Sequence, residues 1–244
     1  DTSSFFAVTS GSAALPQQLA KDFQRKFSCI ILEGYGLSEA APIVTATDPM
    51  KKLKPGSVGL PLPGIKIAVV DEEGNHLPPN EVGELIVSGP NVLKGYYGKP
   101  EETNEALKDG WLYTGDMARI DEEGYLFIVD RKKDLIIRGG FNIYPRDLEE
   151  LLMSHPEVAE AGVVGVPSPK MGEEVVAYIV KRKGSTLTEE DLKQFCEEKL
   201  AKYKTPRFIK IIGFMPRNLI GKIDKKKLRE QAKKDFAEAA ASIK

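Results

Sequence analysis

The stretch DRKKDLIIRGGFNIYP, residues 130–145, decides how this chain is organised. It begins as a charged cluster, continues as a short apolar strand, turns at Gly139–Gly140 and ends where Pro145 opens a helix. Paired glycines favour a tight turn because both accept positive φ, and proline fits the first position of a helix. The sequence pattern differs on the two sides of this stretch, so we expect a domain boundary near residues 130–134.

Before the boundary, the pattern is that of strands separated by turns. The apolar runs IKIAVVD, GELIVSG, MARID and YLFIVD lie between acidic, glycine-containing turn sequences, which predicts hairpins of an antiparallel sheet or small barrel. Nearer the N-terminus we predict buried strands at residues 5–8 and 29–32, an amphipathic helix at 16–27, and a long loop at 34–54. Residues 1–131 therefore read as a β-rich domain with the remnant of an α/β layer.

After the boundary, strands alternate with helices. We predict a helix at 145–153, strands in VAEAGVVGV, EVVAYIVKR and RFIKIIGF, a loop at 216–222 and a final helix from Asp224. A further helix begins at Thr188, whose side chain can form a capping box with Asp191. Residues 132–244 therefore read as a small α+β domain, which makes the fold class of the chain α/β with an α+β C-terminal part.

Composition narrows the class of protein. The 35 basic and 36 acidic residues nearly balance, so we expect a small-molecule partner rather than nucleic acid. The two cysteines, Cys29 and Cys196, indicate reduced core thiols rather than a disulfide framework, and the same count excludes a zinc site. No apolar run reaches membrane-spanning length and no signal segment is present. We expect a cytoplasmic protein whose chain, lacking a recognisable start, begins inside a domain.

The sequence EGYGLSE, residues 33–39, follows a predicted strand, where ligand-binding loops of α/β proteins usually lie. Its glycines permit close approach to the backbone, Tyr35 offers a flat face for a base, and Ser38 offers a hydroxyl for phosphate. Glu39 supplies an oxygen ligand of the kind that Mg²⁺ prefers. Taken alone, the segment is better explained as a turn with a buried tyrosine.

Three other segments carry suitable chemistry. Asp116, which follows Gly115 in YTGD at a predicted strand end, can accept hydrogen bonds from both hydroxyls of a ribose, although an Asx turn explains it as well. Arg131 offers a planar fork for sugar or phosphate oxygens, and Gly139–Gly140 lets a ligand chain pass; a solvated charge cluster and a hairpin turn are the alternatives. Lys222, in a glycine-containing loop, can meet charge on a phosphate, although its neighbouring lysines favour a solvated surface.

The order and spacing of these segments resemble the adenylate-forming superfamily of acyl-CoA synthetases, luciferases and peptide-synthetase adenylation domains. TSGSAALP resembles the adenine-pocket segment of that superfamily, and YGLSE resembles its YGxTE motif. GWLYTGD, VDRKKDLIIRGGFNIYP and the Gly-Lys pair at 221–222 match in turn, so the resemblance covers nearly the whole chain. Chance coincidence of five such matches is negligible.

The resemblance implies a two-step ligase. A carboxylate attacks the α-phosphate of ATP to give acyl-AMP and pyrophosphate, and the thiol of CoA then displaces AMP. By position, Ser12, Gly34 and Tyr35 would frame the adenine. Asp116 and Arg131 would bind the ribose.

The same resemblance assigns the remaining roles. Ser38 would contact the α-phosphate and Glu39 would bind Mg²⁺. Lys222 would stabilise charge in the adenylation transition state. Lys133 would be the hinge about which the small domain rotates between the two steps, and Gly139–Gly140 would line the pantetheine channel of CoA.

The chain departs from the superfamily pattern in three places. Ser38 stands where threonine is usual, and Leu219-Ile220 replaces a small polar pair before Gly-Lys. The Ser/Thr/Gly-rich phosphate loop is absent, so we interpret the chain as the C-terminal part of an AMP-forming acyl-CoA synthetase, a fatty-acid CoA ligase, that is inactive by itself. The alternatives are a free-standing adenylation enzyme that loads a carrier protein and a non-catalytic nucleotide-binding module.

Overall fold

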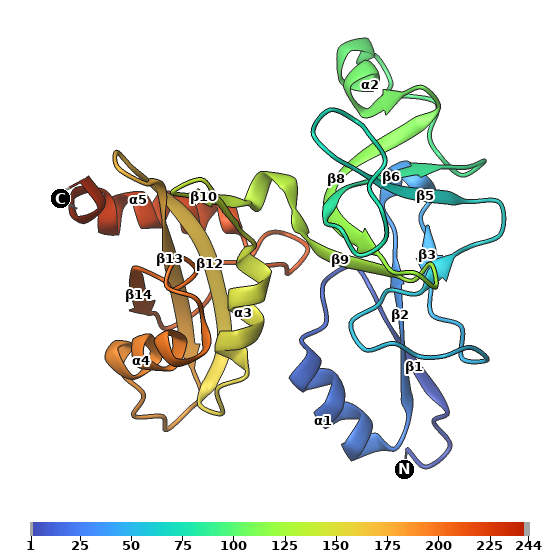
Figure 1. Cartoon of the computed structure of the whole chain (residues 1–244). Coiled ribbons are helices and arrows are strands. Elements are labelled where there is room, and N and C mark those ends of the chain that lie inside the picture. Colours follow the sequence, from blue (N-terminus) through green and yellow to red (C-terminus); the bar gives the residue numbers. More distant parts are fainter. Residues whose placement is uncertain (1, 242–244) are drawn as a thin grey trace. The chain divides into compact units, whose positions relative to one another are not determined.

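The computed structural model describes residues 2–241 and divides into two compact units, unit 1 (Asp1–Lys132) and unit 2 (Lys133–Lys244) (Figure 1). Each unit has its own buried apolar clusters, with Leu85, Leu112 and Leu126 in unit 1 and Ile136, Leu148 and Leu192 in unit 2. The α/β fold class with antiparallel sheets is confirmed. Each unit is described below by itself.

The first sheet of unit 1 has the order β1-β2-β3-β4. Its strands are β1 (Ala7–Ser10), β2 (Ile30–Tyr35), β3 (Thr45–Ala46) and β4 (Leu60–Pro61), and α1 (Gln17–Phe27) connects β1 to β2. Strands β1 and β2 are parallel, with Ser10 opposite Glu33. Because parallel strands end at the same edge of a sheet, the residues that follow both strands are brought together there.

Two predictions for this sheet are wrong in part. Residues 5–8 were expected as a buried strand, but β1 begins at Ala7, and Phe5 and Phe6 are 50% and 73% exposed. Residues 34–54 were expected as one loop, but β2 continues to Tyr35, η1 covers Ser38–Ala40, and β3 pairs with β2. The backbone makes this ladder even where glycine interrupts the apolar pattern, so composition alone did not reveal it.

The second sheet of unit 1 is antiparallel, as predicted. It has the order β5-β6-β8-β7, with β9 paired to β8. The strands are β5 (Lys66–Val70), β6 (Gly83–Ser88), β7 (Leu107–Lys108), β8 (Trp111–Ile120) and β9 (Leu126–Arg131). A helix that was not predicted, α2 (Pro100–Ala106), precedes β7 and has proline at its start.

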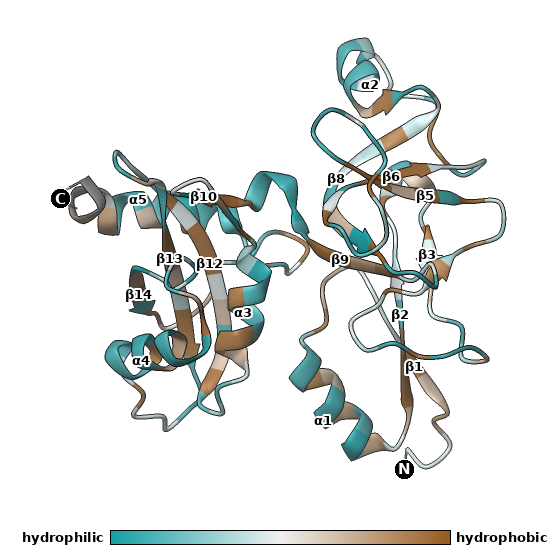
Figure 2. Ribbon diagram, in the orientation of Figure 1, coloured by the Kyte–Doolittle hydropathy of each residue, from teal (hydrophilic) through white to brown (hydrophobic). Residues whose placement is uncertain are grey.

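Unit 2 is one five-stranded sheet with helices against it. Its order is β11-β10-β13-β12, with β14 parallel to β13. The strands are β10 (Ile136–Arg138), β11 (Phe141–Ile143), β12 (Val158–Ser168), β13 (Gly172–Lys181) and β14 (Phe208–Ile211), and a short η2 (Lys132–Asp134) lies at the boundary between the units. Hydrophobic residues follow one another along β12 and β13 (Figure 2).

The helices of unit 2 confirm the sequence predictions. They are α3 (Pro145–Met153), α4 (Glu189–Lys199) and α5 (Lys225–Ala241). The capping box between Thr188 and Asp191 at the start of α4 is present. Side chains of α3 and α4 belong to one apolar cluster of the sheet and Leu228 of α5 belongs to another, which explains why successive residues of β12 and β13 are apolar: both faces are covered.

Both cysteines are buried free thiols, as expected. Cys29 lies in unit 1 and Cys196 in unit 2, and burial raises the pKa of the Cys196 thiol to about 11. Within residues 2–241, no helix is long and apolar enough to cross a bilayer.

Candidate functional site

An acid–arginine pair connects β8 to its edge-strand neighbour β9 in the second sheet. Asp116 of β8 lies directly opposite Arg131 of β9, and Arg131 Nε is 3.2 Å from Asp116 Oδ1. The Asp116 side chain is 8% exposed, whereas that of Arg131 is 56% exposed. The carboxylate is therefore held in place while the guanidinium remains accessible to a ligand. Asp116 was expected at a strand end, but it lies within β8.

Tyr35, at the end of β2, joins the first sheet to this pair. Its hydroxyl donates a 2.6 Å hydrogen bond to Asp116 Oδ2. Burial, together with the negative charge of Asp116, raises the pKa of Tyr35 above its ordinary range. The tyrosine therefore stays a donor to Asp116 at neutral pH. The oxygens of a carboxylate can accept more than one hydrogen bond each, including bonds from the hydroxyl groups of a ligand.

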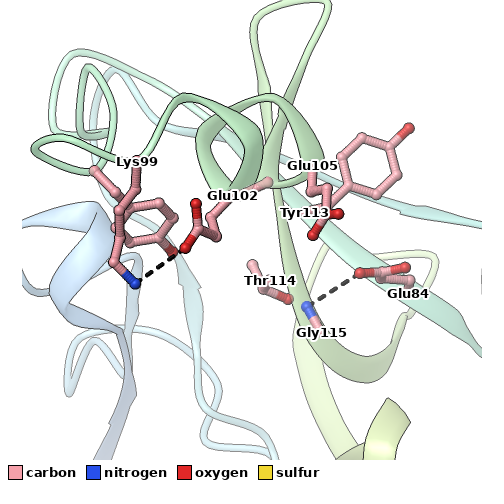
Figure 3. Close-up of a pocket in the computed structure, with 9 residues that line it drawn as sticks. Glu84, Lys99, Glu102, Glu105, Tyr113, Thr114 and Gly115 are labelled. Atoms are coloured by element: carbon pink, nitrogen blue, oxygen red, sulfur yellow. Dashed lines mark hydrogen bonds and ion pairs between the residues drawn. The ribbon is translucent and has the colours of Figure 1, made fainter.

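A residue that the sequence did not single out, Glu84, contacts a chain neighbour of each member of the pair. Its Oε1 accepts from the Gly115 amide at 3.1 Å, and its Oε2 lies 2.8 Å from Lys132 Nζ. Figure 3 shows the hydrogen bond from the Gly115 amide to Glu84. Gly115 precedes Asp116 and Lys132 follows Arg131, so one carboxylate bonds to a neighbour of each member of the pair. Thr114 adds support, because its Oγ1 accepts from the Asp116 amide at 3.1 Å.

Ser12 and Gly34 lie at the edge where β1 and β2 end. Ser12 is exposed and has a φ of 67°, and a Cβ on the preceding Gly11 would lie 3.6 Å from the Gly34 carbonyl oxygen. Gly34 is paired with Ala46 in the ladder. The structure therefore brings Ser12, Gly34 and Tyr35 to one edge of the first sheet, and Tyr35 connects that edge to Asp116.

Gly36 has no room for a side chain. A Cβ there would lie 1.8 Å from the Pro42 carbonyl oxygen. The chain therefore folds back on itself directly after Tyr35. This places the short η1 turn, which carries Ser38 and Glu39, next to the end of β2.

Ser38 and Glu39 differ in exposure. Ser38 is exposed, whereas Glu39 is half-buried and its Oε1 accepts from the Tyr96 hydroxyl at 3.1 Å. Burial and the charge of Glu39 raise the pKa of Tyr96. Among residues 2–241 there is no cluster of three or more acidic, histidine or cysteine ligands. A single carboxylate such as that of Glu39 is compatible with the usual binding mode of Mg²⁺, in which one or two carboxylates and the phosphate oxygens of a substrate hold the ion.

A shallow pocket of about 480 Å³ lies between β8 and the start of α2. Its lining includes Glu84, Thr114 and Gly115, together with Lys99 and Glu102, which form an ion pair at 3.0 Å (Figure 3). The predicted residues Tyr35, Asp116 and Arg131 are not among its lining residues. The pocket therefore borders the predicted site without containing it. Pro100 followed by two glutamates is a helix-start signal that could have revealed its α2 wall.

The remaining predicted residues belong to unit 2. Lys133 is exposed, and its backbone carbonyl accepts from Arg229 Nη2 at 3.1 Å. Gly139 and Gly140 form the turn between β10 and β11, with φ of 59° and 83°. Lys222 ends a loop that the Asn218 side chain closes by accepting from the Lys222 amide at 3.0 Å. Among the described residues, no hydrogen bond or ion pair involves the ammonium group of Lys222.

Comparisons with known proteins show which family the chain resembles. The sequence model of the family described as "AMP-binding enzyme" matches residues 1–97, and that of the "AMP-binding enzyme C-terminal domain" matches residues 147–222. Together the two ranges cover more than half of the chain. The long-chain-fatty-acid–CoA ligase of Bacillus subtilis is 47% identical over 232 residues, covering 95% of this chain and 41% of that protein. The chain thus spans less than half the length of this relative.

Solved structures show the same likeness. ATP-bound MatB from Rhodopseudomonas palustris aligns with a TM-score of 0.89 and 40% identity, covering 92% of this chain and 45% of that one. The o-succinylbenzoate CoA synthetase of Bacillus subtilis, in complex with the acyl-adenylate OSB-AMP, aligns with a TM-score of 0.81 and 37% identity, covering 93% and 46%. With both domain models matched in order and the fold shared, the chain belongs to the AMP-binding, adenylate-forming enzymes.

Proposed function

We propose that this chain is the C-terminal part of an AMP-forming acyl-CoA synthetase that acts on long-chain fatty acids. The carboxylate oxygen of the acid bonds to the α-phosphorus of ATP as the bond to pyrophosphate breaks. The thiol sulfur of CoA then bonds to the acyl carbon as AMP leaves and the thiol proton is lost. The fatty-acid assignment is supported by the names of the relatives in Bacillus subtilis and Escherichia coli.

The observation that carries the proposal is the buried Asp116 carboxylate between Tyr35 and Arg131. The Tyr35 hydroxyl donates to it and Arg131 forms an ion pair with it, so its oxygens are held in a fixed direction, as binding to the two hydroxyls of a ribose requires. The exposed part of Arg131 can contact the same sugar or a phosphate. Ser12 and Gly34, at the adjoining edge, would frame the adenine with the ring of Tyr35.

The phosphates would lie against η1. The exposed hydroxyl of Ser38 would contact the α-phosphate, and Glu39 would hold Mg²⁺. When bound, the metal would neutralise charge on the phosphate oxygens. The chain itself orients the Glu39 carboxylate through the Tyr96 hydroxyl.

Unit 2 would supply the groups that act in turn. Lys222, on its loop, would stabilise negative charge as the adenylate forms. Lys133, at the boundary between the units, would be the hinge, and the Gly139–Gly140 turn would line the channel for the pantetheine chain of CoA. Leu219 and Ile220, which precede Gly221-Lys222, are 107% and 74% exposed, so these two side chains do not pack against the described part of unit 2.

A first experiment measures AMP binding to the isolated chain by calorimetry. We expect weak binding that an Asp116→Asn substitution weakens at least about tenfold, because the acceptor charge is lost. Asp22→Asn, on the exposed face of α1, is the matched control and should bind AMP as the parent does. Equal affinity of parent and Asp116→Asn would contradict the ribose assignment.

A second experiment tests turnover. The isolated chain lacks the phosphate loop, so we expect no carboxylate-dependent exchange of pyrophosphate into ATP. In the full-length enzyme, Lys222→Ala should lower adenylation about 100-fold or more while leaving thioester formation from preformed acyl-AMP nearly unchanged. Lys226→Ala, an exposed lysine nearby, is the control. An equal fall in both half-reactions would contradict the role of Lys222.

The thiol acceptor separates this proposal from its nearest alternative. With preformed acyl-AMP, the full-length enzyme should transfer the acyl group to CoA. If the acyl group were transferred to the phosphopantetheine arm of a carrier protein and not to CoA, the enzyme would instead be one that loads a carrier protein. Absence of both transfers, with AMP binding retained, would identify a nucleotide-binding module.

A further inference from the structure

The Gly139–Gly140 turn is flanked by two residues that are partners in the ladder. Arg138 ends β10, Phe141 begins β11, and the two lie directly opposite one another. Both glycines have positive φ, the geometry of a type I′ hairpin turn. A Cβ on Gly139 would come 2.7 Å from Met171 Cε, whereas a Cβ on Gly140 would meet nothing within 4 Å. One side of the turn is thus packed and the other is open.

Arg138 is directed away from solvent. Its Nε lies 2.7 Å from Glu174 Oε2 of β13, and its Nη1 donates to the Tyr203 carbonyl oxygen at 2.9 Å. The side chain of Arg138 is 14% exposed and that of Glu174 only 1%. Apart from the ion pair, Arg138 Nε and Glu174 Oε2 have no hydrogen-bonding partner among the described residues. None of the residues proposed above to bind the adenylate or CoA belongs to this buried pair.

Tyr203 contacts both flanks of the turn. Its carbonyl accepts from Arg138, and its ring stacks on that of Phe141 with centroids 4.6 Å apart and an interplanar angle of 28°. The Gly139 amide adds a 2.8 Å hydrogen bond to the Met171 carbonyl. The turn is therefore fixed from behind at three points, and its open side carries no polar side chain of its own.

A buried ion pair is an inefficient way to stabilise a fold, because well-packed apolar residues in its place are often as stable. What a guanidinium provides is direction, since its planar fork can hold two acceptors at fixed angles. Here those acceptors are Glu174 on the neighbouring strand and the Tyr203 carbonyl behind the turn. This combination suits a backbone that must be held in one conformation.

We propose that Arg138 is a positioning residue for the thiol-transfer half-reaction. With Glu174 and the Tyr203 carbonyl, it holds the Gly139–Gly140 turn in the conformation that admits the pantetheine chain of CoA. The inference rests on the proposed function, which assigns that ligand to the turn. Arg138 acts through the turn and does not touch the thiol.

The test uses the full-length enzyme with Arg138→Met, with Arg138→Met/Glu174→Leu, and with Arg138→Lys. Arg138→Met alone leaves the buried Glu174 carboxylate without its partner and should lower the thermal stability. The double substitution also removes that carboxylate and should recover most of the lost stability. In both variants the KM for CoA in thioester formation should rise about tenfold, because the turn is no longer held. Pyrophosphate exchange should stay within about twofold of the parent, since the turn takes no part in adenylation.

Two further variants keep the test decisive. Lys210→Met removes another ion pair of unit 2, in which Lys210 Nζ lies 2.8 Å from Asp235 Oδ2. This substitution should leave the KM for CoA unchanged. Arg138→Lys keeps the charge but not the fork, so its KM for CoA should also rise. A double variant with parental stability and a parental KM for CoA would overturn the inference, as would a parental KM in Arg138→Lys. Failure of the proposed function would look different, because the parent itself would form no thioester with CoA.

Discussion

Two arginine–carboxylate pairs, whose arginines are seven residues apart in the sequence, have opposite surroundings. Arg131–Asp116 in unit 1 joins a buried acid to a guanidinium that is 56% exposed, whereas Arg138–Glu174 in unit 2 is closed, at 14% and 1%. In the first pair, the exposed part of the Arg131 guanidinium can contact a ligand. The second has no access to one and can only hold its neighbours. Burial, more than residue type, separates a binding arginine from a positioning one.

The largest expected effect breaks the closed pair. Arg138→Met should lower the free energy of opening around β13 by about 3–5 kcal/mol, because Glu174 is left as an uncompensated buried charge. Arg131→Met should cost about 1 kcal/mol or less around β8, since Arg131 is half-exposed and Asp116 keeps the hydrogen bond from Tyr35. Hydrogen exchange of peptides from β13 and β8 in the isolated chain measures both. Equal losses would remove the distinction between the two pairs.

The next effect concerns the third member of the open cluster. Tyr35→Phe keeps the ring but removes the hydroxyl that donates to Asp116 at 2.6 Å. Because a hydrogen bond to a charged group contributes about 1.5–3 kcal/mol, AMP affinity should fall roughly tenfold by calorimetry. Tyr97→Phe, on a fully exposed tyrosine, is the control. Unchanged affinity would mean that the ring of Tyr35 matters and its hydroxyl does not.

The same tyrosine makes unit 1 sensitive to alkaline pH. Its pKa is raised in the folded state from an ordinary 10.0, so above pH 10 the unfolded chain loses a proton that the folded chain keeps. Stability is then present at lower pH and falls as pH rises, by up to about 1.4 kcal/mol per pH unit for this group. Trp111, the single tryptophan, lies in unit 1, so its fluorescence can follow urea unfolding from pH 9.5 to 11. The parent should lose stability more steeply than Tyr35→Phe; parallel curves would contradict the shift.

The smallest effect tests the brace behind the open pair. Lys132→Met removes the ion pair with Glu84, but the lysine side chain is 50% exposed, so the cost should stay below about 1 kcal/mol. AMP affinity should fall less than about fivefold. Glu84→Ala, which also removes the acceptor of the Gly115 amide, should cost more. If the two variants were alike, the bond to Gly115 would contribute nothing.

The segment 130–145 illustrates what the sequence could predict. The positive φ of Gly139 and Gly140 and the helix from Pro145 follow from local chemistry, since few other residues suit those positions. The different surroundings of Arg131 and Arg138 do not follow, because each partner lies far along the chain. Asp116 is 15 positions from Arg131, and Glu174 is 36 from Arg138. Periodicity reports which residues are apolar, not which distant charge a buried arginine will meet.

The misses have the same origin. Glu84 reads as one more polar residue of a strand, yet the sheet places it between Gly115 and Lys132. Phe5 and Phe6 read as core, yet they lie outside β1 and are exposed. The segment 34–54 reads as a loop because its composition resembles one, although the ladder between β2 and β3 depends on backbone groups that composition does not report.

The placement of the two cysteines has a practical consequence. Each unit contains one buried thiol, Cys29 at 5% exposure and Cys196 at 0%. Burial raises the pKa of Cys196 to about 11, so its reactive thiolate is scarce while unit 2 stays folded. A thiol reagent, with modified peptides identified by mass, would thus time the opening of each unit separately in the unmutated chain. Each unit thus contains a natural reporter thiol for its own opening.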